Sequence, residues 1–98
     1  MNYRTPATDR LMDAIAALGD RESCYRFFED ACTVRELIDV AQRFKVASML
    51  AEGQSYLTIT KETGMSTATI SRVSRALSYG TGGYREALSR LVGEDTDA

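Results

Sequence analysis

The residues best suited to chemistry form a polar and basic set between positions 66 and 75. A helix turns by about 100° per residue, and at that spacing one face of this segment collects small, hydroxyl and arginine side chains. The residues on this face are Ala68, Ser71, Arg72 and Arg75. The opposite face collects the apolar residues Ile70, Val73 and Leu77. No acidic residue interrupts the polar face, which predicts a surface built to meet a partner rather than water.

Double-stranded DNA is the partner that this chemistry favours. Small side chains at the start of the helix allow close approach to base edges, their hydroxyl and methyl groups can contact bases, and arginine binds guanine or phosphate. We expect the DNA-contacting residues to be Tyr56, Lys61, Ser66, Thr67, Ala68, Thr69, Ser71, Arg72 and Arg75.

A helix-turn-helix unit over about residues 56–78 would position this face. A short helix is followed by a turn at Gly64 and Met65, and Ser66 can cap the second helix. Glycine suits the left-handed backbone that such a turn requires. Ile59 stands where the two helices must pack, but the next position, where alanine or glycine is common, holds Thr60.

The rest of the chain also reads as helix, so the predicted fold class is all-α with six helices in a single domain over residues 1–98. Thr5 can cap a first helix over about 6–18, and Asp20 can cap a second. Thr33 and Glu36 have the capping-box spacing and predict a long third helix that ends near Gly53. The second helix carries an apolar stripe that is typical of a core or a partner-facing element.

Charge and composition exclude several function classes. The chain of 98 residues has a net charge of −2, yet residues 55–90 hold five basic and two acidic residues, a local charge of +3. This asymmetry favours one basic surface over general coating of nucleic acid. No apolar stretch approaches the roughly 20 residues of a membrane span, so we expect a cytoplasmic protein without membrane contact.

Neither a metal site nor an enzyme is expected. The chain contains no histidine, and Cys24 and Cys32 lie eight residues apart, outside any zinc-binding spacing. It also lacks a glycine-rich phosphate loop and a convincing pair of catalytic carboxylates.

The chain resembles the Trp repressor superfamily, most closely the YerC/YecD group of Trp-repressor-related proteins. The matching segments are "CYRFFEDACTVREL", "AQRFKVASMLAEGQSY", "ETGMSTATISRVSRAL" and "YREALSRL". The resemblance implies an intertwined homodimer, with dimerisation helices over about residues 6–52 and 82–92. It also implies that the paired helix-turn-helix heads read a palindromic operator, with half-sites about 34 Å apart in successive major grooves.

The same resemblance raises the question of a corepressor. In the Trp repressor two arginines enclose the tryptophan ring, and they look like Arg43 and Arg72; with Thr33 they are the candidate ligand-contacting residues. The glycine and the serine that adjoin the ligand in that repressor are replaced by Val73 and Ala76. We therefore expect no tryptophan corepressor and no other cofactor, and the small-molecule effector is unknown.

Without a ligand, Arg43 could pair with a carboxylate such as Asp39, four residues earlier on the same helix face. The leading hypothesis is a dimeric, sequence-specific DNA-binding transcriptional regulator, such as a repressor. The alternatives are a helix-turn-helix module that binds another protein and a repressor that responds to tryptophan or another amino acid.

Overall fold

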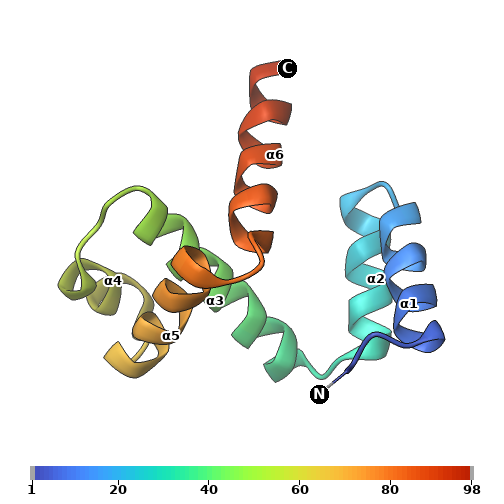
Figure 1. Cartoon of the computed structure of the whole chain (residues 1–98), viewed down its shortest axis with the longest axis horizontal. Coiled ribbons are helices and arrows are strands. Elements are labelled where there is room, and N and C mark those ends of the chain that lie inside the picture. Colours follow the sequence, from blue (N-terminus) through green and yellow to red (C-terminus); the bar gives the residue numbers. More distant parts are fainter. Residues whose placement is uncertain (1, 98) are drawn as a thin grey trace. The chain divides into compact units, whose positions relative to one another are not determined.

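The computed structural model describes residues 2–97, with side chains as far as residue 92, and every regular element in this range is a helix (Figure 1). The helices are α1 (Pro6–Ala17), α2 (Arg21–Ala31), α3 (Val34–Ala51), α4 (Tyr56–Thr63), α5 (Thr67–Tyr79) and α6 (Gly83–Asp97). The all-α prediction is confirmed. The chain divides into two compact units, Met1–Leu37 and Ile38–Ala98, so that the boundary falls within α3.

The first three helices begin where their capping residues predict. The Oγ1 atom of Thr5 accepts the amide of Thr8 at 3.2 Å, and the Asp20 carboxylate accepts the amide of Ser23 at 3.0 Å. Thr33 and Glu36 form the expected capping box, with hydrogen bonds of 2.8 and 3.1 Å. Each bond satisfies a backbone donor that would otherwise lack a partner at a helix start.

The first unit has no buried residue in α1 or α2. In the apolar stripe of α2, Cys24, Phe27 and Phe28 are half-buried and Ala31 is exposed. The rings of Phe27 and Phe28 meet edge to face with their centroids 5.2 Å apart. Leu11, Met12 and Tyr25 are exposed. These helices therefore carry apolar surface without a core of their own.

The second unit contains the buried core that holds α4 and α5. Its buried cluster joins α3 to the helix-turn-helix through Val46, Ala47, Met49, Ile59, Ile70 and Val73. Leu50, Met65 and Tyr84 pack against this cluster, and the Tyr84 ring lies 6.4 Å from that of Phe44, centroid to centroid. Burial of each such aliphatic side chain stabilises the fold by about 1.5–3 kcal/mol. This core fixes the direction in which α5 presents its outer face.

Among the described residues, no helix is both long and apolar enough to cross a membrane.

Candidate nucleic-acid interface

The turn between α4 and α5 has the geometry that the sequence predicts. Gly64 adopts a left-handed backbone with φ of 72°, and its amide donates to the carbonyl of Thr60 at 2.9 Å. The Oγ1 atom of Thr63 donates to the carbonyl of Ile59 at 2.7 Å and accepts the amide of Met65 at 3.1 Å. A side chain at position 64 would add about 1–2 kcal/mol of backbone strain. The turn angle is thus set by local bonds on both sides of the glycine.

Thr60 stands where the helix-turn-helix motif commonly has alanine or glycine, and its larger polar side chain affects the local packing. Ile59 is fully buried, as the motif requires. Thr60 is half-buried, and its Oγ1 atom is enclosed without a hydrogen-bond partner among the residues that the structure describes. The helices accommodate the added bulk, but one hydroxyl group remains unsatisfied.

The first turn of α5 uses two of the expected DNA-contacting hydroxyls for its own cap. The Oγ atom of Ser66 accepts the amide of Thr69 at 3.2 Å and lies 3.1 Å from the Oγ1 atom of Thr69. Thr69 is half-buried, whereas Thr67 and Ala68 are exposed beside it. The small exposed side chains at this end of the helix are therefore Thr67 and Ala68, and the hydroxyls of Ser66 and Thr69 hold the helix start.

We call the exposed residues opposite the buried stripe of α5 its outer face: Ala68, Ser71, Arg72 and Arg75. The division into two faces is confirmed, because Ile70, Val73 and Leu77 are buried. The helix contains no Asp or Glu. Within the described part of the chain, the side chains of Arg72 and Arg75 make neither a hydrogen bond nor an ion pair. Their full positive charge is available to an anionic partner.

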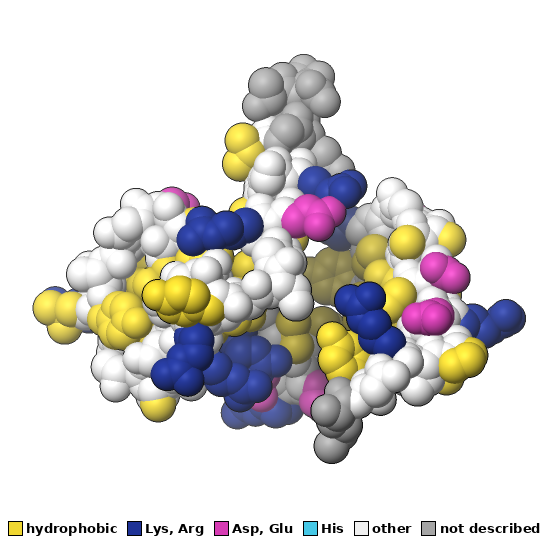
Figure 2. Space-filling model, in the orientation of Figure 1, with side chains coloured by type: hydrophobic (Ala, Val, Ile, Leu, Met, Phe, Trp, Pro, Cys, Tyr) yellow, Lys and Arg dark blue, Asp and Glu magenta, His cyan; other side chains and the backbone are white. Residues whose placement is uncertain are grey.

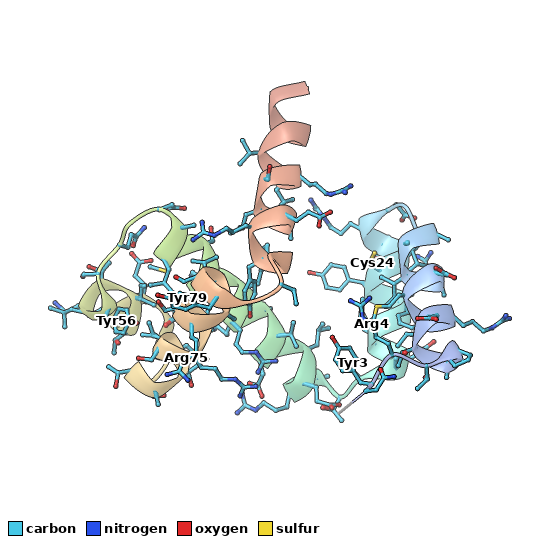
Figure 3. All side chains as sticks on the ribbon, in the orientation of Figure 1. Tyr3, Arg4, Cys24, Tyr56, Arg75 and Tyr79 are labelled. Carbon is cyan, nitrogen blue, oxygen red and sulfur yellow. The ribbon has the colours of Figure 1, made fainter. Side chains whose placement is uncertain are left out.

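This charge is visible on the surface. Figure 2 shows Lys and Arg side chains gathered beside α5 and the middle of α3, and Figure 3 shows Arg75 on α5. Lys61 is exposed on α4 and adds a further positive charge to the helix-turn-helix.

Tyr56 is tied to α5 although it begins α4. Its side chain is 37% exposed, and hydrogen bonds from the Ser74 and Ser71 hydroxyls hold the pKa of the phenol below its usual value of 10. Tyr56 on α4, labelled in Figure 3, therefore lies close to the hydroxyls of Ser71 and Ser74 on α5. Ser74 was not expected from the sequence, since only the packing of α4 on α5 brings it near position 56.

The end of α5 contains two further features that were not expected from the sequence. Arg85, on α6, donates from its Nε atom to the carbonyl of Leu77 at 3.1 Å, which satisfies one of the last free carbonyls of the helix. Tyr79 is 87% exposed. Its spacing of four residues from Arg75 would have placed it on the outer face by the same 100° step that identified the others.

The candidate ligand-contacting residues Arg43, Arg72 and Thr33 differ in burial and in the unit to which they belong. Arg43 is half-buried on α3, in the same unit as the exposed Arg72, and it makes no ion pair with another described residue. The expected pairing with Asp39 is therefore not formed. Thr33 belongs to the first unit, and its hydroxyl serves the capping box of α3.

Val73 and Ala76, the two positions that differ from the Trp repressor pattern, have different surroundings. Val73 is 2% exposed within the buried cluster, and Ala76 is exposed. Ala76 lines a shallow hollow of about 300 Å³ together with Gly80, Thr81, Gly83 and Tyr84. Val73 contributes to the core, and Ala76 offers no hydroxyl to this hollow.

Most of the chain is similar to known proteins of one family. A family model described as "Trp repressor protein" matches residues 7–92. The uncharacterized protein YerC of Bacillus subtilis (strain 168) is 51% identical over 90 residues, which are 92% of this chain and 86% of YerC.

Two solved structures are also similar. The crystal structure of a TrpR-like protein from Eubacterium eligens ATCC 27750 has a TM-score of 0.86 and 50% identity, covering 90% of this chain and 91% of that one. The crystal structure of a putative Trp repressor from Staphylococcus aureus has a TM-score of 0.85 and 50% identity, covering 90% of this chain and 88% of that one. The six-helix fold implied by the sequence resemblance is thereby confirmed.

Proposed function

The chain belongs to the Trp repressor family, and from that premise we propose that it is a sequence-specific transcriptional regulator that binds double-stranded DNA as a homodimer. The α4–Gly64–α5 unit is its DNA-binding element, and α5 is its recognition helix. Paired units in the dimer would read the two halves of a palindromic operator.

The main support for this proposal is the outer face of α5. Arg72 and Arg75 are exposed and unpaired within the described residues, and α5 has no acidic side chain to oppose them. Thr67 and Ala68, at the helix start, are small enough to allow close approach to base edges. In this assignment the small residues read bases and the arginines bind phosphate or a guanine edge.

The first unit supports the homodimer. It spans residues 1–37, it has no buried residue in α1 or α2, and both of its cysteines are free. Segments shorter than about 40 residues usually need a disulfide, a metal or association with another chain to hold a fold. A second copy would cover the exposed apolar side chains of Leu11, Met12 and Tyr25.

Selection of genomic DNA fragments followed by fluorescence anisotropy tests the proposed function. We expect the wild-type protein to enrich a palindromic site and to bind it with a steep dependence on salt concentration. Arg72→Ala and Arg75→Ala should each weaken binding, and loss of a phosphate contact should reduce the salt slope by about one. Arg4→Ala, an exposed change that precedes α1, is the matched control and should bind as the wild type does.

Salt-insensitive binding that both arginine variants retain would overturn the assignment. Recovery of a protein partner from lysate after nuclease treatment, with no genomic fragment enriched, would instead indicate a helix-turn-helix that binds another protein.

We propose further that tryptophan is not the corepressor of this regulator. Val73 is committed to the core, Ala76 lacks the hydroxyl that would hold the amino group, and the hydroxyl of Thr33 is used in a helix cap. Isothermal titration calorimetry with tryptophan should give no saturable heat. A saturable signal at micromolar tryptophan that Arg43→Ala or Arg72→Ala abolishes would refute this proposal.

A further inference from the structure

The most exposed tyrosine on the helix-turn-helix lies at the end of α5 and is not among the residues expected to contact DNA. Tyr79 is 87% exposed, and Figure 3 shows it on the same helix as Arg75. No hydrogen bond of its phenol occurs among the described residues. An aromatic side chain of this size left in water is a candidate contact.

Helical spacing places Tyr79 on the outer face. Counted at 100° per residue, positions 68, 72, 75 and 79 fall within about 60° of one another. Their direction is opposite to that of the buried residues Ile70, Val73 and Leu77. Tyr79 therefore continues the line of Arg72 and Arg75 toward the end of the helix.

The outer face from Ala68 to Tyr79 is longer than the major groove is wide, so its two ends would meet different parts of the DNA. Ala68 and Tyr79 are eleven residues apart, about 16 Å at 1.5 Å per residue. The major groove of B-DNA is about 12 Å wide. When Ala68 lies against base edges, the end of α5 that holds Tyr79 must lie near the phosphates at the edge of the groove.

The local electrostatics of this helix end suit a phosphate. The final carbonyls of a helix carry partial negative charge, which would repel an anion. Here the Arg85 guanidinium donates to the carbonyl of Leu77 at 3.1 Å, and Arg75 lies one turn before Tyr79. Two positive side chains thus offset the charge of the helix end beside the tyrosine.

We propose that Tyr79 is a phosphate-contacting residue, its phenolic O–H donating to a backbone oxygen at the edge of the groove while Arg75 binds the same strand. The proposal rests on the proposed DNA-binding function and extends it to the end of α5. Tyrosine and arginine are both common donors to phosphate oxygens, and such contacts position a protein on DNA without reading its sequence.

Anisotropy with the selected operator and with an unrelated duplex tests the contact. Tyr79→Phe, which removes only the hydroxyl, should weaken binding to both duplexes by about fivefold, the effect of about one neutral hydrogen bond. The salt slope should stay unchanged because no charge is lost, whereas Arg75→Ala should reduce it by about one. Tyr3→Phe, which removes the same hydroxyl from an exposed tyrosine outside the helix-turn-helix, is the control and should have no effect.

The outcomes separate the two proposals. If the wild type binds DNA and Tyr79→Phe and Tyr79→Ala bind both duplexes equally well, the Tyr79 contact is refuted and the proposed function stands. If the wild type binds no DNA, the proposed function fails first. A change in sedimentation coefficient for the Tyr79 variants would also overturn the contact, since it would put Tyr79 in a subunit interface.

Discussion

Replacing Thr60 by valine should stabilise this protein, although the change removes a polar group from the proposed DNA-binding element. The Oγ1 atom of Thr60 is enclosed and has no hydrogen-bond partner among the described residues. A buried hydroxyl without a partner costs about 1–3 kcal/mol. Valine has nearly the same shape and a similar helix propensity. We expect the free energy of unfolding to rise by about 1 kcal/mol, because the slightly larger methyl offsets part of the gain.

Thr63→Val is the matched control, with the opposite expected sign. Thr63 lies on the same helix, but its Oγ1 atom donates to the carbonyl of Ile59 at 2.7 Å and accepts the amide of Met65 at 3.1 Å. Valine removes both bonds and leaves the amide of Met65 unsatisfied. The free energy of unfolding should fall by about 1–3 kcal/mol. The same chemical change three residues apart thus distinguishes an unpaired hydroxyl from a paired one.

Thermal and urea denaturation of both variants beside the wild type would measure these effects. A change of 1 kcal/mol corresponds to a shift in Tm of about 4–8 °C for a domain of this size. All samples need the same protein concentration, because association contributes to apparent stability. A Thr60→Val protein that is no more stable than the wild type would refute the reasoning about the enclosed hydroxyl, provided that Thr63→Val shows its expected loss.

Two further predictions concern the helix ends. Gly80→Ala should lower the free energy of unfolding by about 1–3 kcal/mol in urea denaturation, because a Cβ atom there would clash with the backbone carbonyl oxygen of Ala76. An alanine that leaves stability unchanged would contradict this close approach. The pKa values of the Asp20 and Glu36 carboxyls are held below their ordinary 3.8 and 4.5, mainly by the Ser23 hydroxyl and the Thr33 amide respectively. A lowered folded pKa gives stability that is present above the ordinary value and is lost as the pH falls through the folded value. Glu36→Gln should therefore lose less stability than the wild type between pH 5 and pH 2, and equal losses would show that the ionised Glu36 carboxylate contributes no stability.

The helix limits and the helix-turn-helix could be predicted from the sequence because they depend on residues close together in the chain. The caps at Thr5, Asp20 and Ser66 each join atoms three residues apart. Gly64 was expected in a left-handed turn and has φ of 72°. The two faces of α5 followed from helical geometry alone. These features need no knowledge of what packs against the helix.

The residues that the sequence reasoning missed depend on contacts between different helices. Ser74 meets Tyr56 across the α4–α5 packing, and Arg85 reaches back from α6 to the carbonyl of Leu77. The expected pairing of Arg43 with Asp39 had the correct spacing on one helix, but that spacing permits an ion pair without requiring one. An arginine side chain has several rotamers, so all the groups around it decide which ion pair it forms.

The helices, their caps, the glycine turn and the polar outer face of α5 could all be predicted from the amino-acid order, since each follows from backbone geometry over three to eleven residues. The packing of the helices shows in addition that Ser71 and Ser74 lie near Tyr56, that the Thr60 hydroxyl is enclosed without a partner among the described residues, and that α1 and α2 contain no buried residue. The physical reason is that burial and hydrogen-bond satisfaction are properties of the space around a side chain. That space is filled by residues far away in the chain.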